Sequence, residues 1–319
     1  MCLLLSEMLR ARNENTGAVS PACSTRGCSP NGHAHDQRAP AAGDRRVPSF
    51  ACGRPARHEP CSVAVAMSLT REEHVPASAD AGRDEPTVPP ELCGLWRRVV
   101  LEAPGTPPDT TTRVWWLQTP TLYVDLRLPA ARRGVPSCTT LDAASDDDLD
   151  TLAQQAGFAG QTWLDGTLCR WQRDIDFQPP SGVPDEGRLR IDDGWIVEDG
   201  VHASYREVWQ REDDSVGDWI ARRWTERPGK PDARVCYLVA GGDWFLFARA
   251  RSGPPLEQAP SLAELLARRA LDRAGRAALL DFEISLGHRE SATPARTWRV
   301  ELSTLPEREG EPLGPAAEG

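Results

Sequence analysis

Hydrophobic and polar side chains alternate strictly along residues 121–128, TLYVDLRL. A period of two is typical of a β-strand that presents one apolar and one polar face. Leucine and valine occupy one face, and Tyr123, Asp125 and Arg127 occupy the other. If the leucines face inward, this is an ordinary half-buried strand. If a helix covers the leucines, the polar face lines an enclosed space and forms the floor of a binding site.

Similar patterns, bounded by Gly, Pro and hairpin signals such as Asp165-Gly166, predict about a dozen strands from residue 92 onward. Most of them are joined by short turns, which favours antiparallel pairing. The predicted strands are 94–101, 111–118, 121–128, 158–164, 168–177, 188–192, 195–201, 202–211, 233–240, 243–250, 282–288 and 297–302.

Two helices are predicted between these strands. Ser145 is a suitable N-cap for a helix over Asp146–Ala156, since its hydroxyl can accept an unpaired backbone N–H, and Gly157 is expected to end it. Ser261 caps a second helix over Ser261–Leu271 that extends toward Leu280. Two helices are too few to connect parallel strands, so the pattern predicts an antiparallel β-barrel or sandwich.

The first part of the chain has a different composition. All 11 Trp and all three Tyr lie beyond residue 90, so residues 1–90 are predicted to be disordered or loosely attached. Met67 offers a second start, and residues 1–66 are either an upstream extension or a genuine tail. They carry a net charge of +3, whereas the whole chain carries −10. Residues 91–310 are predicted to fold, and residues 311–319 to form a disordered tail.

The charge and cysteine patterns exclude several classes of protein. The chain is acidic and has one lysine, Lys230, so no nucleic-acid surface is expected. No apolar run has the length of a membrane span, and the leucines after Met1 are too few for a secretory signal, so a cytoplasmic protein is expected. The cysteines after residue 90 are scattered without a CxxC pair, so neither a metal nor a cofactor is expected.

Familiar catalytic motifs are missing from the sequence. It contains no nucleophile elbow, P-loop, GxGxxG turn or HExxH helix. His202 has Ser204 and Glu207 close by, which makes it a weak catalytic candidate, but a lone strand histidine is more often a plain surface or core residue.

The informative pattern is the recurrence of charged residues beside aromatic ones on several strand faces. A buried charge is costly unless it is paired or faces water or a ligand. Arg173 could therefore pair with Glu207, and Asp125 with Arg127 or Arg97, inside a barrel; the alternative is an exposed sheet face with weak cross-strand pairs. The candidate ligand contacts are Trp96, Arg97, Trp116, Tyr123, Asp125, Arg127, Trp171, Arg173, Tyr205, Glu207 and Trp209.

Gly94-Leu95-Trp96 resembles the Gly-x-Trp signature of lipocalins, in which the Trp closes one barrel end and an Arg from a late strand packs across it. Arg249 and Arg299 are the candidates for that Arg. The phrases LWRRVV, GFAGQTW, CRWQRDIDFQPP, YREVWQR and TWRVELSTLP are similar to bacterial relatives of the fungal HRI family over about residues 92–310. The resemblance implies a lipocalin-like β-barrel, either one wide barrel or two lobes over 91–212 and 213–310, and it supplies no catalytic residues.

Three functions remain open. The first is a non-catalytic protein that binds a small aromatic or amphipathic molecule with an anionic group. The second is an isomerase or hydrolase that uses Glu207 or Asp125 as general base. The third is a protein-interaction scaffold, which the resemblance favours because the fungal HRI member interacts with a casein kinase and a protein-sorting factor.

Overall fold

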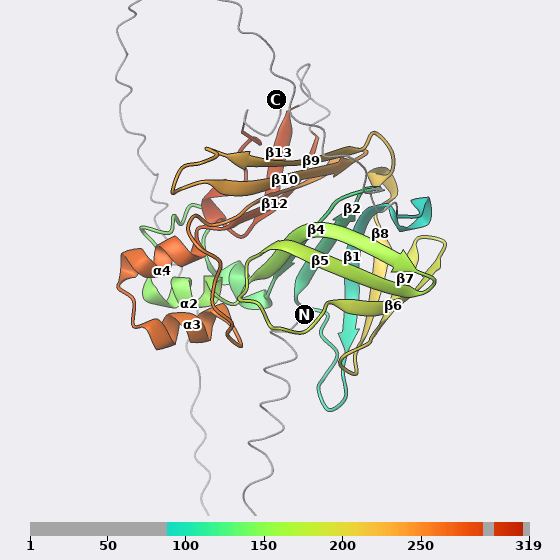
Figure 1. The fold of residues 1–319 in the computed structure, drawn as a ribbon, viewed down its shortest axis with the longest axis horizontal. Helices are drawn as coiled ribbons and strands as arrows, with labels where there is room; N and C mark the ends of the chain where they lie inside the picture. The colour runs from blue at the N-terminus through green and yellow to red at the C-terminus, as the bar shows by residue number, and fades with distance from the viewer. Residues whose placement is uncertain (1–87, 290–296, 315–319) are drawn as a thin grey trace, which may run out of the picture. The chain divides into compact units, whose positions relative to one another are not determined.

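The computed structural model describes residues 88–289 and 297–314. Within these ranges the fold is mainly β, as predicted, with a closed antiparallel barrel of eight strands and a separate five-stranded sheet (Figure 1). The described strands therefore do not all belong to one wide barrel. The barrel strands are β1 (Gly94–Glu102), β2 (Arg113–Gln118), β3 (Tyr123–Leu128), β4 (Ala156–Asp165), β5 (Leu168–Asp176), β6 (Glu186–Asp192), β7 (Trp195–Gly200) and β8 (Arg206–Arg211).

Each barrel strand pairs with the next one along the chain, and β8 closes the barrel on β1. The second sheet has the order β13-β12-β11-β10-β9, so it too is a simple meander. Its strands are β9 (Ile220–Glu226), β10 (Arg234–Gly241), β11 (Trp244–Arg249), β12 (Glu283–Arg289) and β13 (Trp298–Ser303). The α-helices among the described residues are α2 (Asp146–Leu152), α3 (Leu262–Arg269) and α4 (Arg273–Leu280).

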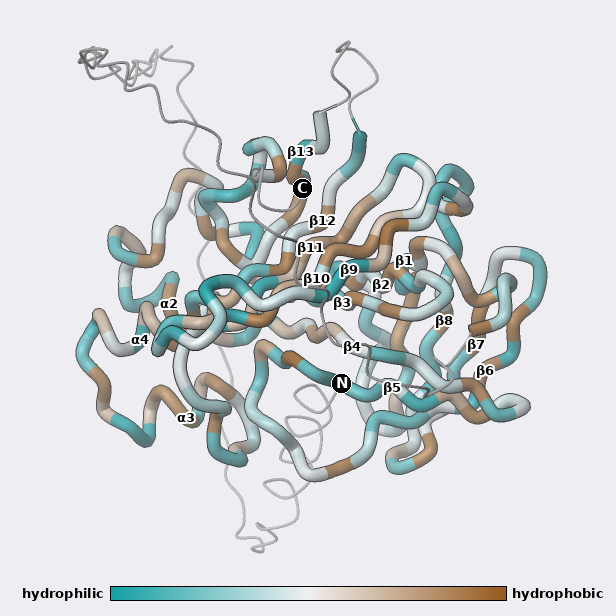
Figure 2. The backbone as a smooth tube through the Cα atoms, turned by 45° about the horizontal axis from the view of Figure 1, so that its top comes forward, coloured by the Kyte–Doolittle hydropathy of each residue, from teal (hydrophilic) through white to brown (hydrophobic). Residues whose placement is uncertain are grey.

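Strand β3 is buried on both faces, and this settles the orientation of the TLYVDLRL pattern. Val124, Leu126 and Leu128 point away from the barrel into a core shared with the second sheet and the helices. The cover is mostly a sheet, whereas the sequence offered a helix as one possible cover. Hydrophobic segments are concentrated where β10 and β11 lie beside β2 and β3 (Figure 2). The sheet side of this core comprises Tyr237, Val239, Leu246, Ala248, Ile284 and Leu286.

The opposite face of β3 lines the barrel interior, where aromatic rings form a second core. Trp116 lies at its centre, with ring centroids 5.6 Å from Trp171 and 5.9 Å from Trp209 in edge-to-face geometry. Such pairs add to the stabilisation that ring burial gives. Tyr123 packs edge-on against Phe158 at 6.0 Å.

Trp96 and Arg211 close one end of the barrel. The Arg211 guanidinium lies 5.4 Å from the ring centre of Trp96, and its Nη1 donates to the carbonyl of Glu91 at 3.3 Å. The Trp96 Nε1 donates to the carbonyl of Leu92, in the 3₁₀ turn η1 (Pro90–Leu92). Arg249 and Arg299 were the wrong candidates for this contact. They lie in β11 and β13 of the second sheet, whereas the last strand of the barrel is β8.

The first predicted helix is shorter than expected. The capping box at Ser145 is present, but α2 ends at Leu152, and Gln155 donates its side-chain N–H to the Leu152 carbonyl. Ala156 already pairs with β3, so Gly157 lies in β4 and does not end the helix. A side chain at Gly157 would collide with the Asp125 carbonyl and with Ile284 of the second sheet, so glycine is required there by close packing.

The second predicted helix is two helices, which corrects the count from two to three. Ala270 adopts a left-handed backbone conformation with φ of 45°, and this ends α3. Asp272 then caps α4 by accepting the Gly275 N–H at 2.8 Å. The Asp-containing cap competes with continuation of the helix, as short polar side chains do near turns.

Two further predictions differ from the structure. The strand expected at 202–211 begins at Arg206, because 202–205 form the connection from β7, and β9 was not predicted at all. Most of the predicted disordered segment 1–90 lies outside the described residues. Val88 within it is buried and donates its N–H to Pro120, and Leu313 of the predicted tail is buried and donates to Trp298.

Truncation of Val124 to Ala tests the contact between the barrel and the second sheet. Val124 is fully buried, so Val124→Ala should lower the free energy of unfolding by about 2–3 kcal/mol, from two lost methyl groups and a residual cavity. Val216→Ala makes the same chemical change at a residue that is 51% exposed and should cost less than about 0.5 kcal/mol. Urea titrations give both values. Equal effects would contradict the assignment of this face to a core.

Candidate functional site

Charged side chains form a buried network inside the barrel. Arg98 Nη1 donates to Glu207 Oε1 at 2.7 Å, and its Nη2 donates to Asp109 at 2.7 Å. Arg127 Nε donates to Asp125 Oδ1 at 2.7 Å, so of the two partners that the sequence offered for Asp125, Arg127 and Arg97, the structure has Arg127. These short charge-assisted contacts offset the cost of removing the groups from water. Glu207 is paired with Arg98 and not, as expected, with Arg173.

The remaining space inside the barrel is small. A cavity of about 10 Å³ lies among Trp116, Asp125, Arg127, Glu198 and Trp209, which is about the least space that can hold one water molecule. A ring-sized ligand does not fit there. Within the described residues four buried polar atoms of the interior have no hydrogen-bond partner, namely Trp116 Nε1, Trp209 Nε1, Arg127 Nη1 and Glu207 Oε2.

Glu198 lies opposite Glu207 in the pairing of β7 with β8. Burial raises the pKa of Glu198 to about 8, and the negative charge of Glu207 adds to the shift. The Tyr205 hydroxyl donates to Glu198 Oε1 at 2.8 Å. The raised pKa of Glu198 favours its neutral form, because a second negative charge beside Glu207 would be costly in the interior.

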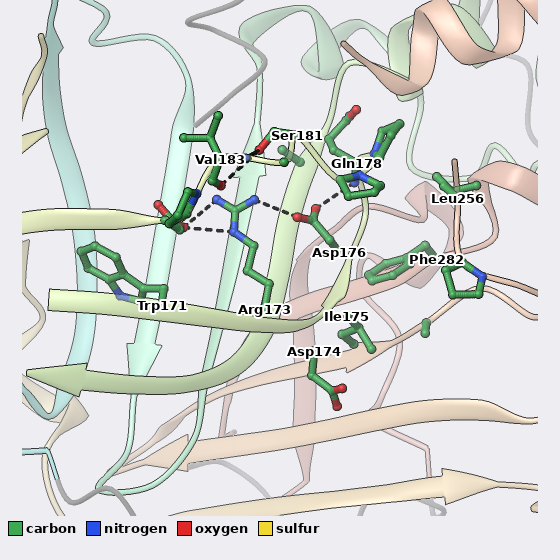
Figure 3. Close-up of a pocket in the computed structure, with 18 of the residues that line it drawn as sticks. Trp171, Arg173, Asp174, Ile175, Asp176, Gln178, Ser181, Val183, Leu256 and Phe282 are labelled. Carbon is green, nitrogen blue, oxygen red and sulfur yellow. Dashed lines mark hydrogen bonds and ion pairs between the residues drawn. The ribbon is translucent and has the colours of Figure 1, made fainter. Parts of the chain in front are cut away.

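A second, much larger pocket lies at the barrel end opposite Trp96. Strands alternate in direction around the barrel, so the β5–β6 and β7–β8 connections share this end. Together with the β11–α3 connection and the start of β10 they enclose about 750 Å³ (Figure 3). We call this cavity the mouth pocket.

Two proline-rich loops and three aromatic rings line the mouth pocket. The loops are residues 178–186 and 250–260, and the rings belong to Trp171, Tyr205 and Phe282. Proline restricts backbone freedom, so these walls lose little entropy when a ligand binds. The lining prolines are Pro179, Pro180, Pro184, Pro254, Pro255 and Pro260.

Arg173 reaches into the mouth pocket from β5 and is held by two carboxylates (Figure 3). Its Nη1 donates to Asp176 at 2.7 Å, and its Nη2 donates to Asp185 at 2.6 Å. The guanidinium also stacks on Phe158 at 3.6 Å from the ring centre. Burial alone would raise the pKa of Asp185, but the charge of Arg173 holds this pKa below its ordinary value. Arg173 is thus already neutralised.

The predicted ligand contacts fall into three groups in the structure, and Trp171 belongs to two of them. Trp171, Arg173 and Tyr205 line the mouth pocket. Trp96, Arg97 and Glu207 line neither cavity. Those that line the small interior space are Trp116, Tyr123, Asp125, Arg127, Trp171 and Trp209.

The prediction that Arg97 contacts a ligand inside the barrel is wrong, because Arg97 lies on the outer face of β1. Its Nη2 donates to Gln210 at 2.9 Å, its Nε pairs with Glu212, and its side chain is 41% exposed. Successive residues of a strand point to opposite faces, so Trp96 and Arg98 face inward and Arg97 cannot.

Of the candidate catalytic residues, Asp125 and Glu207 lie on either side of Arg127, whose Nη1 is 4.0 Å from Glu207 Oε1, and His202 lies apart from them. Asp125 and Glu207 are enclosed within the barrel and are paired with Arg127 and Arg98. His202 lies in the β7–β8 connection, where its Nε2 is 2.9 Å from Glu186 Oε2. His202 does line the mouth pocket, but no serine or carboxylate of the interior contacts it.

Sequence reasoning missed the loops that build the mouth pocket, together with Asp185 and Arg251. The sequence predictions rest on alternating strand faces, and loop residues have no such period. One available signal was the repeated Pro-Pro pair, in QPPSGVPDEG and in SGPPLEQAP. Two rigid loops of this kind, separated by about seventy residues, could have been expected to frame a cavity.

No protein-family model, curated protein or solved structure matches the chain. Within residues 88–289 and 297–314, no helix is long and apolar enough to cross a membrane. The same part of the chain contains no group of His, Cys, Asp and Glu side chains that could hold a metal ion.

Ionisation of Glu198 should make stability depend on pH. Its pKa is about 8 when folded, against 4.5 for an ordinary glutamate, so between these pH values only the folded state holds the proton. Stability should then fall as pH rises, by at most about 1.4 kcal/mol per pH unit. Glu198→Gln removes this term and still accepts the Tyr205 hydroxyl. The free energy of unfolding of the variant minus that of the wild type should therefore increase from pH 5 to pH 8.

Urea titrations across this pH range measure the difference. Glu102→Gln, at an exposed position of β1, is the matched control and should leave the difference constant. Parallel curves for Glu198→Gln and wild type would show that Glu198 ionises normally.

Proposed function

We propose that this protein binds a small amphipathic molecule in the mouth pocket, without catalysing a reaction. The observation that carries the proposal is the pocket itself. Its volume of about 750 Å³ lies within the range of small-molecule sites, roughly 300–1,000 Å³. Its lining combines rings and prolines with a few charged groups, as such sites do.

The proposed ligand lies outside the barrel, over its open end. An apolar or aromatic body would pack on Trp171, Tyr205 and Phe282, and the proline loops would hold it in place. The interior of the barrel serves as a rigid floor in this proposal, because side chains fill it. The candidate contacts Trp116, Tyr123, Asp125, Arg127 and Trp209 would then support the site from beneath.

A lipocalin-like relationship, and with it the HRI family, remains part of the proposal. Two observations support it: the eight-stranded up-and-down barrel, and the packing of Arg211 from the last barrel strand across Trp96 at the start of the first. The site differs from a ligand chamber inside the barrel, because the second sheet contributes one of its walls.

Neither alternative function gains a specific observation. A general base must reach the proton that it abstracts, and Asp125 and Glu207 are paired and enclosed. The large exposed apolar residues in the described ranges are Val183, Trp195, Val201 and Val216. Val183 belongs to the mouth pocket, so its exposure does not by itself favour an interaction scaffold.

Phenylnaphthylamine, a neutral aromatic probe that fluoresces in apolar surroundings, tests the proposal. The wild-type chain should bind it with micromolar affinity. Ala203 lines the pocket and is partly exposed, so Ala203→Trp should fill the space and weaken binding by about tenfold or more. Ala221→Trp introduces the same side chain at an exposed position of β9 and should leave affinity unchanged. Equal affinities for the two variants would refute the assignment of the ligand to this pocket.

A further inference from the structure

Arg251 stands at the wall of the mouth pocket without a carboxylate partner. It lies two residues beyond the end of β11 and makes three hydrogen bonds to backbone carbonyls: Nε to Leu279 at 2.9 Å, Nη1 to Asp176 at 3.3 Å and Nη2 to Phe177 at 2.6 Å. It forms no ion pair with any carboxylate of the described residues. A guanidinium carries five N–H groups, so two are left for another acceptor.

The surroundings of Arg251 are apolar. The guanidinium lies 5.0 Å from the ring centre of Phe282 and 5.7 Å from that of Phe177. Burial lowers the pKa of Arg251 to about 10, although Asp176 and Asp281 act against this shift from a longer range. Arg251 is therefore still a cation at pH 7. A largely buried cation without a counterion is costly, and a partner with a negative charge would relieve that cost.

The other arginine of the pocket also keeps two N–H groups, but two carboxylates already neutralise its charge. All the donor nitrogens of Arg173 already point at Asp176 and Asp185. Arg173 is thus paired with two carboxylates, whereas Arg251 is paired with none among the described residues. The sequence predicted a ligand with an anionic group, with Arg97, Arg127 and Arg173 as the arginines among the candidate contacts, and the structure offers a cation without a carboxylate partner at Arg251 instead.

We infer that Arg251 anchors the ligand through a singly charged acidic group, a carboxylate or a sulfonate. This inference rests on the proposed function and specifies the ligand as an amphipathic monoacid. The planar fork of arginine matches such a group and gives it a fixed orientation. The apolar body would extend along Phe282, Val235 and Leu256, which also line the pocket. A doubly charged group is disfavoured, because Asp174, Asp176 and Asp185 lie around the same cavity.

The test compares pairs of probes that differ by one acidic group, on the full-length chain. Anilinonaphthalene sulfonate has the ring system of phenylnaphthylamine plus a sulfonate, and should bind about tenfold more tightly. Decanoate should likewise displace phenylnaphthylamine at about tenfold lower concentration than decanol, which tests the carboxylate.

Arg251→Gln should remove the preference for both acids and leave phenylnaphthylamine affinity within about twofold. Arg190→Gln is the control, since Arg190 is an exposed arginine paired with Asp199 outside the pocket. If Arg251→Gln does not fold, Arg251→Lys keeps the charge without the fork and should lose only part of the preference.

The outcomes separate the two proposals. If phenylnaphthylamine binds and Ala203→Trp blocks it, but the acids gain nothing over their neutral counterparts in wild type, the role of Arg251 is overturned and the pocket stands. The same conclusion follows if the acid preference survives Arg251→Gln. If no probe binds, or if binding ignores Ala203→Trp, both the proposed function and this inference fail.

Discussion

The packing of the second sheet on one side of the barrel is the contact on which the rest of the structure depends. It covers the leucines of β3 and thereby makes both faces of that strand interior. A strand that alternates Leu with Tyr, Asp and Arg must then place its charges inside the barrel. The contact is close enough that Gly157 has no room for a side chain between Asp125 and Ile284. Interior charges are tolerated there because each finds a partner of opposite sign or, like Glu198, favours its neutral form.

The same contact explains why the two cavities differ so much in size. Inside the barrel, six aromatic rings and the paired charges fill the available space, as is common for closed sheets of eight strands. At the open end, the two proline-rich loops meet where Gln258 Nε2 donates to the Ser181 carbonyl at 3.0 Å, and together with the start of the second sheet they surround a cavity of about 750 Å³. Hence the larger cavity arises where the barrel and the second sheet meet.

Much of this could be predicted from the sequence, and the failures have physical causes. The period of two located most strands, because alternation is a local property of the chain. It could not locate β9, whose IARRWTE segment has charges on both faces. Nor could it locate the break between α3 and α4, which depends on the left-handed conformation of Ala270 and the N-cap at Asp272. Arg127 and Asp125 are two residues apart on one strand face, so their pairing was predictable. The partners of Glu207 and Arg173 were not, because they are set by register and by a loop. Nothing in the sequence marks Arg251, because what distinguishes it is that it forms no ion pair with a carboxylate of the described residues in the folded protein.

The walls of the mouth pocket come from segments that are distant in sequence, from Trp171 in the barrel to Phe282 beside the second sheet. The cavity therefore exists only while both layers are docked, and a molecule bound there bridges them. By mass action, occupancy and docking must reinforce each other. A tightly bound ligand would stabilise the contact between the two layers. It would therefore slow hydrogen exchange in both β10 and β5, although these strands do not pair with each other.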